Sequence, residues 1–446
     1  MENYRKIESG NMATKFQPPK GTRDFMPEDM ARREYVFSTI KRVFESFGFR
    51  PMETPAFESW ELLGAKGGGG EAIRNEAYVF KDKGGREMGL RFDLTVPTAR
   101  VVASNPQLPR PFKRLQIGRV WRYDNPQAGR FREFWQADID TFGVTGMEAD
   151  AEIIAAAVEA LNFLGFGDFK VRLNDRKLLN GIVESAGIKE ESAPAVFRAL
   201  DKLEKQGEKA VEGELSGAGL GIAAIGKLMK SITTKGKPEE VLASAKKKFK
   251  CKSAEDGIRE LEQILELCKS YGVAQFVEID FSLVRGLDYY TGPIFEISAA
   301  GSLGSMAGGG RYDKLIGMLS GRDEPAVGIS LGVERVCELM NQKGMFKDVP
   351  SIKTKVFVAA AGDGDELRKA VIETAQKLRS EGVPAETDLM GRKLKQCFEY
   401  AEKAGIPYMI IIGEKELASG KLTLRNMARR EQAELGMDGV LEMLRL

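Results

Sequence analysis

The pattern of apolar and polar positions divides the chain into segments of helical and of strand character. In residues 26–49 the apolar side chains recur at helical spacing, and a proline and a glutamate stand near the start of the pattern. Residues 112–124 and 132–144 alternate as two antiparallel strands would, and a basic loop joins them. The same reasoning predicts further strands that end near residue 55, begin at 86 and span 168–175, and helices that end near 104 and span 148–165.

Residues 177–272 differ from their surroundings, because they are helix-rich, contain few aromatic residues and are dense in lysine. Within them, residues 227–252 hold nine lysines against two glutamates. Strand character returns at 275–298 and continues through 304–319 and 326–340, where a strand leads into a helix. The pattern therefore predicts one antiparallel domain that is interrupted by a helical insertion.

From residue 354 onward, strands and helices alternate in short units, which predicts a small separate α/β domain behind a polar linker. The expected division of the chain is a polar tail (1–20), the first part of the strand-rich domain (21–176), the helical insertion (177–272), the second part of the strand-rich domain (273–345), the linker (346–353) and the C-terminal domain (354–446).

Composition narrows the chemistry that the chain can perform. The 446 residues include no histidine, so no protein imidazole serves as an acid, a base or a metal ligand. The four cysteines form no Cys-x-x-Cys pair, which argues against a zinc site and indicates free thiols in a reducing compartment. These free thiols lead us to expect a cytoplasmic protein. No apolar run approaches the roughly 18 residues of a membrane span, so we expect no membrane partner. The net charge of +2 does not by itself indicate a nucleic-acid partner.

Three arginines mark the edges of predicted strands: Arg122, Arg285 and Arg335. A guanidinium group is a rigid fork of donors that matches the oxygens of a carboxylate or a phosphate. For any one of these arginines alone a surface salt bridge is the better explanation, but together they favour a polyanion that is held against a sheet.

Two glycine-rich runs and four acids complete the candidate chemistry. The run at 67–70 lacks the lysine of a P-loop and is typical of a surface loop. The run at 308–310 stands directly before Arg311 and Tyr312, and small residues there let the backbone approach a ligand closely. The acids on predicted strands, each of which has a solvent-facing alternative, are Asp93, Asp124, Asp138 and Asp140.

The order of several motifs along the chain is specific. Residues 46–55 (SFGFRPMETP), 112–143 (FKRLQIG to DTFG) and 326–336 (AVGISLGVERV) resemble motifs 1, 2 and 3 of the class II aminoacyl-tRNA synthetases. Residues 283–296 (LVRGLDYYTGPIFE) and 307–318 (AGGGRYDKLIGM) resemble the two signatures of the histidyl-tRNA synthetase family, and the resemblance covers nearly the whole chain. It implies an α+β fold: a class II antiparallel-sheet catalytic domain with a helical insertion, a C-terminal α/β anticodon-binding domain, and a homodimer whose interface includes motif 1.

The resemblance also implies a reaction. The family activates L-histidine with ATP, which binds together with Mg²⁺, and then transfers the histidyl group to the 3′ end of its tRNA. The histidine carboxylate is already ionised at neutral pH, so activation needs no general base, and the site has only to position the substrates and neutralise charge. The resemblance assigns ATP binding to Arg122, Asp124, Phe134 and Arg335, and histidine binding to Asp93, Thr95, Gln136, Asp140, Arg285, Tyr289, Tyr290 and Tyr312.

The resemblance also implies a specific role for most of these residues. Arg122 would hold the α-phosphate, Arg335 the far phosphates, and Phe134 would stack on the adenine ring. Arg285 would bridge the histidine carboxylate and the α-phosphate in place of a metal ion that related enzymes use. The residues that would receive the α-ammonium group are Asp93, Thr95 and Gln136, and those that would line the imidazole pocket are Asp140, Tyr290 and Tyr312.

The chain departs from the family pattern at three carboxylates. Asp93, Asp124 and Asp140 are each one methylene shorter than the glutamates that the pattern leads us to expect. Either the backbone lies further inward in this variant, or the site binds its substrates more weakly.

Two other functions stay open at this point. One is the inactive regulatory subunit of ATP phosphoribosyltransferase, which shares the catalytic fold but typically lacks the C-terminal domain and the motif arginines. The other is a synthetase-like RNA-binding or sensor module. The lysines of 227–252 are candidates for contacts to the tRNA backbone, and a solvated helical face is the alternative.

Overall fold

Two compact units make up the computed structural model, which describes residues 16–64, 74–125, 129–285, 289–302, 304–350 and 352–445. One unit comprises the described residues up to Asp24 together with Val36–Met345, and the other comprises Phe25–Tyr35 and the described residues from Phe346 onward. The glycine run at 67–70 lies outside the described residues, as do most of the 1–20 tail and residues 286–288.

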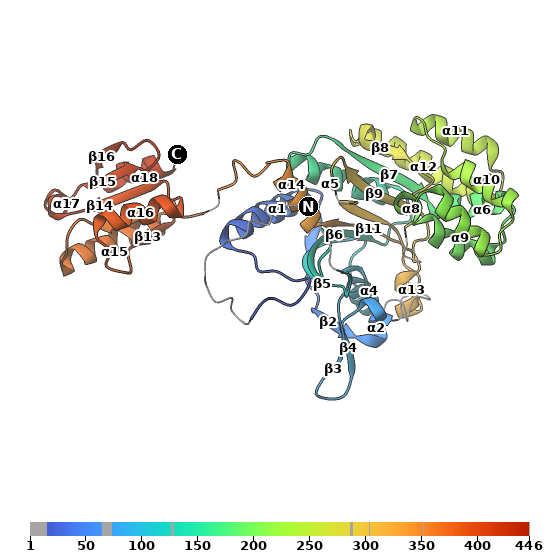
Figure 1. Cartoon of the computed structure of the whole chain (residues 1–446), viewed down its shortest axis with the longest axis horizontal. Coiled ribbons are helices and arrows are strands. Elements are labelled where there is room, and N and C mark those ends of the chain that lie inside the picture. Colours follow the sequence, from blue (N-terminus) through green and yellow to red (C-terminus); the bar gives the residue numbers. More distant parts are fainter. Residues whose placement is uncertain are drawn as a thin grey trace. The chain divides into compact units, whose positions relative to one another are not determined.

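An eight-stranded sheet forms the centre of the first unit (Figure 1). Neighbouring strands are antiparallel except at the two edges, where β1 and β8 run parallel to their neighbours. The two strands predicted on either side of the basic loop are β5 and β6, and they pair along their whole length. From edge to edge the strands are β1 (Arg50–Pro51), β5 (Phe112–Trp121), β6 (Glu133–Phe142), β11 (Ala326–Gly332), β10 (Ala307–Arg311), β9 (Pro293–Ala299), β7 (Phe169–Asp175) and β8 (Val277–Ile279).

Helices cover the sheet and carry the connections that the periodicity predicts. α5 (Glu148–Phe163) packs on β11 and buries a run of alanines, whose small side chains let the helix lie close to the sheet. The other helices described in this region are α2 (Trp60–Gly64), α4 (Thr95–Ser104), α13 (Leu315–Ser320) and α14 (Val333–Gln342), and α1 (Pro27–Ser46) belongs to this unit from Val36 onward.

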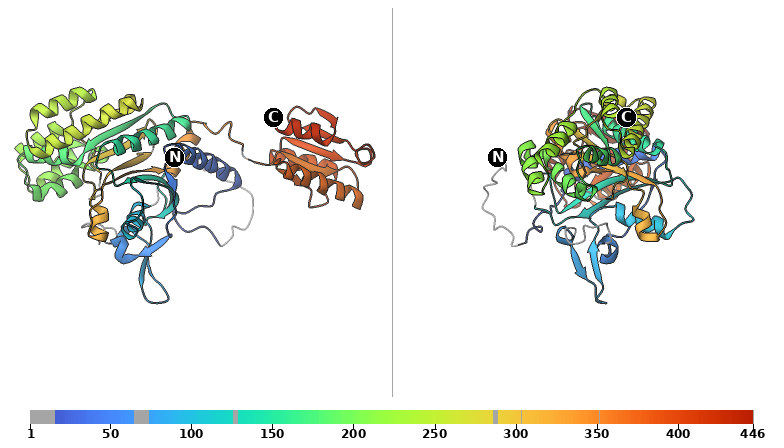
Figure 2. Two further views of the ribbon diagram at one scale, coloured as in Figure 1. Left: turned by 180° about the vertical axis from the view of Figure 1, so that it is seen from behind. Right: turned by 90° about the vertical axis from the view of Figure 1, so that its right-hand side faces the viewer.

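A small three-stranded sheet extends away from the large one as a hairpin with an added strand (Figure 2). Its order is β2 (Phe57–Ser59), β4 (Glu87–Leu90) and β3 (Val79–Lys81). The sequence predicts a single strand that ends near residue 55, whereas the structure has β1 in the large sheet and β2 in the small one. Pro51 ends β1 and Pro55 stands between the two strands, and a proline has no N–H to continue a ladder.

The helical insertion is confirmed, and glycines allow its first and last helices to pack closely. A Cβ at Gly181 would lie 2.5 Å from the Ala254 Cβ, and a Cβ at Gly257 would lie 2.6 Å from the Leu178 amide nitrogen. The elements of this region are α6 (Arg176–Ser185), η1 (Glu190–Ser192), α7 (Ala193–Leu200), α8 (Leu203–Gln206), α9 (Glu208–Gly217), α10 (Ile222–Ile232), α11 (Pro238–Lys248), α12 (Lys252–Ser270) and η2 (Ala274–Phe276).

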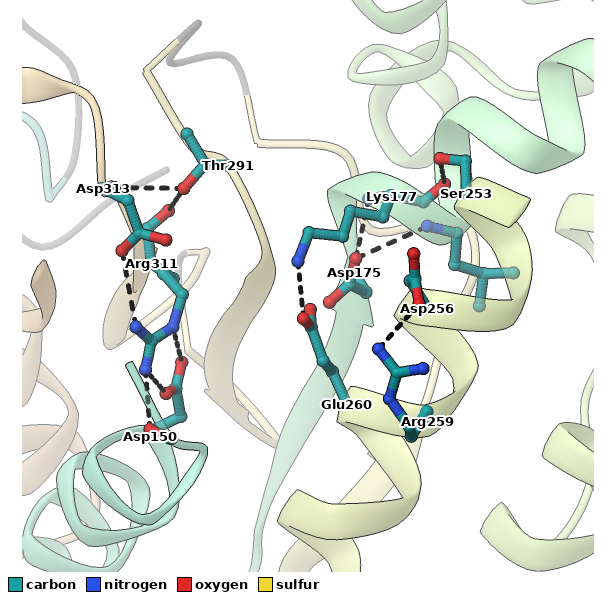
Figure 3. A network of polar contacts seen from close by, with 12 residues as sticks. Asp150, Asp175, Lys177, Ser253, Asp256, Arg259, Glu260, Thr291, Arg311 and Asp313 are labelled. Atoms are coloured by element: carbon teal, nitrogen blue, oxygen red, sulfur yellow. Dashed lines mark hydrogen bonds and ion pairs between the residues drawn. The ribbon is translucent and has the colours of Figure 1, made fainter. Parts of the chain in front are cut away.

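A polar network joins the insertion to the end of β7 (Figure 3). The Asp175 carboxylate caps α6 by accepting hydrogen bonds from the amides of Lys177 (2.7 Å) and Leu178 (3.4 Å). The Lys177 ammonium in turn pairs with Glu260 of α12 (2.5 Å), and the Lys177 carbonyl accepts a hydrogen bond from the Ser253 hydroxyl (2.7 Å). Burial, followed by the charge of Glu260, raises the pKa of Asp175 well above its usual range.

Arg311, which follows the glycine run of the second signature, belongs to the core and does not line the cavities described below. Its guanidinium is 2% exposed and forms an ion pair with Asp150 of α5 (Figure 3). It also donates to the carbonyls of Val144 and Gly146, each at 2.9 Å. The arginine therefore fastens β10 to the start of α5.

The second unit holds a five-stranded mixed sheet with helices on both faces. Alternate side chains of one strand point to opposite faces, so Val356 and Val358 pack with α15 and α18, whereas Phe357 and Ala359 pack with α16. The sheet order is β13 (Ala385–Thr387), β12 (Val356–Ala360), β14 (Tyr408–Ile412), β15 (Leu422–Asn426) and β16 (Gln432–Leu435). The helices are α15 (Asp365–Ser380), α16 (Leu394–Ala404), α17 (Glu414–Ser419) and α18 (Met437–Arg445).

The alternation predicted for this unit is present, and two short elements that the sequence did not predict, α17 and β16, are added to it. Within the described parts of both units, none of the helices has the length and apolar character that crossing a membrane requires.

Candidate functional site

One face of the eight-stranded sheet bears a cavity of about 400 Å³. Paired residues on neighbouring antiparallel strands point to the same face, so each row of partners across the sheet is a row of neighbouring side chains. One row runs Asp138, Ser330, Gly308, Glu296 and Arg172, from β6 to β7. A second row runs Arg114, Asp140, Gly328 and Gly310, from β5 to β10. Residues of both rows line the cavity.

Glycines in these rows leave the space that functional side chains occupy. A Cβ at Gly308 would lie 1.5 Å from an Nη atom of Arg285, and a Cβ at Gly328 would lie 1.9 Å from a carboxylate oxygen of Asp140. The sequence suggested that the run at 308–310 lets the backbone approach a ligand. In the structure, Gly308 makes room for a side chain of the protein itself.

A second cavity of about 150 Å³ shares lining residues with the first, and arginines converge on the pair of cavities. The Arg122 guanidinium lies 5.3 Å from the centre of the Phe134 ring. Arg335 of α14 donates a hydrogen bond to the Ser305 carbonyl (2.6 Å). Burial lowers the pKa of Arg335, and the charges of Arg130 and Arg122 lower it further. Guanidinium groups that repel one another in this way form a site for an anion that carries several charges.

Arg285 lines both cavities. Its Nη1 lies 3.4 Å from the carboxylate of Glu296 on β9. Burial acts to lower the pKa of Arg285, but the neighbouring Tyr290 and Glu296 outweigh it, and the pKa is raised. The guanidinium is therefore charged at every pH at which the protein is folded.

Two buried carboxyl groups in the larger cavity share one buried arginine. The Arg114 Nη2 lies 2.5 Å from Asp140 and 3.8 Å from Asp138, and the Tyr312 hydroxyl donates a hydrogen bond to Asp140. Burial raises the pKa of Asp138 to about 7 and raises that of Asp140 as well, although the charge of Arg114 lowers both. With one cation for two carboxyl groups, the charge of Arg114 does not offset the effect of burial, and the pKa of each carboxyl group stays raised.

Three phenols stand beside this pair. The ring of Tyr289 lies 4.7 Å from that of Tyr290 and 5.7 Å from that of Tyr312, measured between ring centres. Burial raises the pKa of each phenol, so all three keep their protons and can donate hydrogen bonds.

Every site residue that the resemblance implies lines one or both of the cavities in the structure. Those that line the larger cavity are Asp93, Thr95, Arg122, Gln136, Asp140, Arg285, Tyr289, Tyr290 and Tyr312. Those that line the smaller one are Arg122, Asp124, Phe134, Gln136, Arg285 and Arg335.

The sequence analysis assigned no role to several residues that line the larger cavity or contact a lining residue: Arg114, Arg130, Asp138, Asp201 and Glu296. Asp138 was noted only as an acid on a strand. Glu296 ends the quoted signature at 283–296, which was the available signal for it. Arg114 faces Asp140 only through the register of β5 and β6, and the loop between them is too long for its sequence to set that register.

Comparisons with known proteins identify the family. A sequence model described as histidyl-tRNA synthetase matches residues 21–336, and one described as anticodon binding domain matches residues 355–445. The histidine–tRNA ligase of Thermococcus kodakarensis strain KOD1 is 39% identical over 426 residues, which cover 95% of this chain and 97% of that protein. The chain belongs to the histidyl-tRNA synthetase family.

Solved structures agree with this assignment. The histidyl-tRNA synthetase from Nostoc sp. PCC 7120 is 33% identical, with a TM-score of 0.85 over 97% of this chain and 99% of that one. A structure from Bacillus halodurans C, titled as an ATP phosphoribosyltransferase regulatory subunit/histidyl-tRNA synthetase, is 24% identical, with a TM-score of 0.74 over 90% of this chain and 99% of that one. That second likeness shows the fold alone.

As a member of the histidyl-tRNA synthetase family, the chain is a class II aminoacyl-tRNA synthetase and a histidine–tRNA ligase that uses ATP as a substrate. The regulatory-subunit alternative is weaker, because the chain matches an anticodon-binding domain and retains Arg122, Arg285 and Arg335.

Proposed function

We propose that the larger cavity binds histidine, that the smaller cavity binds ATP, and that the two substrates react beside Arg285. The observation that carries this proposal is the shared lining of the cavities, since Arg122, Gln136 and Arg285 line both. A carboxylate in one cavity and a phosphate chain in the other would meet at the same guanidinium groups.

In the activation step, a carboxylate oxygen of histidine attacks the α-phosphorus of ATP. The bond from that phosphorus to its bridging oxygen breaks, and pyrophosphate leaves with the oxygen. No proton has to leave the nucleophile. The protein supplies positive charge around the five-coordinate phosphorus: Arg285 between the carboxylate and the α-phosphate, Arg122 at the α-phosphate and Arg335 at the far phosphates. In the second step, the oxygen of a 3′-terminal hydroxyl of tRNA attacks the carbonyl carbon of the histidyl-adenylate. The bond from that carbon to the phosphate oxygen breaks, AMP leaves with the oxygen, and the hydroxyl proton is released.

The position of Gln136 supports a binding site for the α-ammonium group of histidine. Its Nε2 donates to the Ser330 hydroxyl (2.6 Å), which orients the amide, and its Oε1 is buried without a hydrogen-bond partner among the described residues. A buried acceptor of this kind is costly unless a ligand donates to it. Together with Asp93 and Thr95, it offers an ammonium group the oxygens that it needs.

For the imidazole ring we propose a carboxylate at one nitrogen and a phenol at the other. Asp140 would accept the ring N–H, and Tyr290 would donate to the bare nitrogen. Arg114 and Tyr312 hold Asp140 in place from two sides. A pocket that pairs both ring nitrogens rejects analogues that lack one of them by roughly 10⁴–10⁵.

The carboxylates of the smaller cavity fit a Mg²⁺ ion that arrives with ATP. Asp124 and Glu334 line this cavity beside the arginines. Mg²⁺ is usually held by one or two carboxylates together with substrate phosphates, and no group of three or more metal-ligating side chains occurs in the described part of the chain. We propose that these two acids hold the ion, which when bound would neutralise phosphate charge.

We propose that tRNA binds the C-terminal domain and the lysine-rich part of the insertion. Three of the lysines in that part have partners within the protein: Lys246 with Glu262 (3.1 Å), Lys252 with Asp256 (3.0 Å) and Lys248 with the Ser231 hydroxyl (2.8 Å). The exposed lysines that are better placed to meet phosphates are Lys235, Lys237 and Lys247. We further propose a homodimer, which rests on the resemblance to motif 1, and a cytoplasmic location, which rests on the free cysteines.

Histidine-dependent exchange between ATP and labelled pyrophosphate tests the proposal. The wild-type protein should exchange with histidine and with none of the other standard amino acids. Arg285→Ala should lose roughly 10²–10³ in turnover while it folds normally. Arg119→Ala is the matched control, because that arginine is half exposed and pairs with Glu133 across the hairpin (3.5 Å). A folded Arg285→Ala protein with near-normal exchange would contradict the assignment, and a wild-type protein without exchange would favour the regulatory-subunit or sensor alternatives.

A further inference from the structure

An unbroken series of ion pairs runs from the helical insertion to Arg285. Glu204 of α8, in the insertion, lies 3.0 Å from Nη1 of Arg172 on β7. The same nitrogen lies 3.3 Å from Oε1 of Glu296. The other carboxylate oxygen of Glu296, Oε2, lies 3.4 Å from Nη1 of Arg285. The charges therefore alternate along the series, from the insertion to the arginine that we place at the reacting atoms.

The sheet register places the middle of this series. Arg172, Glu296 and Gly308 are direct partners on β7, β9 and β10, so their side-chain positions are neighbours on one face. Gly308 has no side chain, and the Arg285 guanidinium lies in the space that one would fill. Arg172 and Arg285 thus lie on opposite sides of Glu296 and share its carboxylate.

The two ends of the series differ in how firmly they are held. Arg172 is 13% exposed, and its Nε donates to the Asp280 carboxylate (2.7 Å), which Ser282 also holds. Although burial would raise the pKa of Asp280, its hydrogen bonds with Ser282 and the charge of Arg172 leave the pKa lowered. Glu204 is 77% exposed, and a pair of that kind contributes little free energy. The Arg172 end is therefore fixed, and the Glu204 end is the weak member.

We propose that Arg172 is a positioning residue for Arg285, acting through Glu296, and that Glu204 makes this positioning depend on the placement of the insertion. While Arg172 takes one oxygen of Glu296, Arg285 engages only the other and keeps its remaining donors for substrate. Without Arg172, the full charge of Glu296 would draw the Arg285 guanidinium toward β9. A cavity of about 670 Å³ between the insertion and the sheet is lined by all four residues, so the pairs can rearrange without unpacking the core. The inference rests on the proposed part of Arg285 in activation.

The test measures kcat and KM separately, in pyrophosphate exchange, for a set of variants whose folding is checked by thermal unfolding. For Arg172→Gln we expect kcat to fall about tenfold and the KM for ATP to change less than about twofold, because Arg285 acts mainly on the transition state. Arg172→Lys, which keeps the charge but not the fork, should recover part of the loss. Glu204→Gln should lower kcat about twofold, as expected for an exposed pair.

A double-mutant cycle decides whether the residues act in series. In the Arg172→Gln background, Glu204→Gln should have no further effect, since the series of ion pairs that joins Glu204 to Arg285 is already broken. Glu208→Gln is the matched control, because Glu208 is an exposed glutamate of the next helix, α9. It should leave both constants unchanged.

Three results would overturn the inference. The first is an Arg172→Gln protein that is less stable but whose folded fraction has wild-type kcat, which would make Arg172 structural only. The second is an unchanged effect of Glu204→Gln in the double variant. The third, should Arg172→Gln not fold, is a folded Arg172→Lys protein with wild-type kcat. A wild-type protein without histidine-dependent exchange in the same assay would instead refute the proposed function, and the two failures are thus distinguishable.

Discussion

Replacing Gly308 with alanine should abolish the contribution of Arg285 without unfolding the protein. The new Cβ would lie 1.5 Å from Nη1 and 2.4 Å from Cζ of Arg285. Non-bonded heavy atoms prefer separations of about 3.5 Å, so the guanidinium has to move by roughly 2 Å. Since it is the end of a flexible side chain, it can do so while the backbone of β10 stays in place.

The expected loss of kcat in Gly308→Ala follows from the role that we propose for Arg285 in the transition state. A preorganised donor that is lost from a developing charge costs roughly 10²–10³ in kcat, or about 3–4 kcal/mol. The neighbouring Gly309 provides a contrast, because a Cβ there would lie 2.0 Å from the Gly328 carbonyl oxygen and 2.7 Å from the Ile329 Cα. Those are backbone atoms of the adjacent strand. Gly309→Ala should therefore destabilise the sheet, whereas Gly308→Ala should mainly reduce turnover.

Pyrophosphate exchange and thermal unfolding, measured together, separate these effects. Gly167→Ala is the control for adding a methyl group, because nothing lies within 4 Å of a Cβ at that position. If Gly308→Ala acts by displacing Arg285, the double variant with Arg285→Ala should be no slower than Arg285→Ala alone. The reasoning is refuted if folded Gly308→Ala protein keeps near-normal exchange, or if the losses of the two single variants multiply in the double variant.

Three further predictions concern tRNA binding and pH. Changing Lys235, Lys237 and Lys247 to alanine should weaken tRNA binding. It should also reduce the slope of log affinity against log salt concentration by somewhat less than one unit for each phosphate that is no longer neutralised. Filter binding across a salt series measures both effects, and Lys246→Ala, the control, should have a smaller effect. Asp138 has a pKa of about 7 in the folded protein against about 3.9 in the unfolded chain, so the native state binds the extra proton and the unfolding free energy should fall as pH rises from 4 to 7. Asp138→Asn should flatten that fall in urea titrations at several pH values. If the site selects neutral imidazole, kcat/KM for histidine should fall below about pH 6.5, and a histidine analogue with a lower ring pKa should move the fall to lower pH.

The sequence was sufficient for those elements whose signal is local. The alternation in residues 112–124 and 132–144 predicted β5 and β6, and helical spacing predicted α1, α5 and, in the C-terminal unit, α15, α16 and α18. The candidate side chains could be chosen because the motifs that carry them are short and contiguous. Elements of three to six residues, such as β2, β16 and α17, were missed, since so few positions do not establish a period.

What the sequence could not supply is the order of strands in space. β11 lies between β6 and β10, and this order is what brings Asp138 opposite Ser330 and Ser330 opposite Gly308. No local pattern in the chain encodes a pairing between residues so far apart in sequence. The space that Gly308 leaves for Arg285, and the carboxylate that Arg285 shares with Arg172, both depend on that order.

The three short carboxylates can be explained by the same register. Asp140 stands directly opposite Arg114 in the β5–β6 pairing, and its carboxylate already lies 2.5 Å from Nη2. A further methylene would extend the side chain by about 1.5 Å and drive it into that guanidinium.

The other two short acids also have protein partners nearby. Asp124 lies 3.2 Å from Nε of Arg130, and Asp93 accepts a hydrogen bond from the Val96 amide (3.1 Å) at the start of α4. Each carboxylate is thus held by a donor that a short side chain reaches. A carboxylate that is already fixed in this way loses little conformational entropy when a ligand binds. This smaller entropy cost offsets the shorter reach of aspartate compared with glutamate. Shorter acids at these positions therefore do not by themselves imply weaker binding.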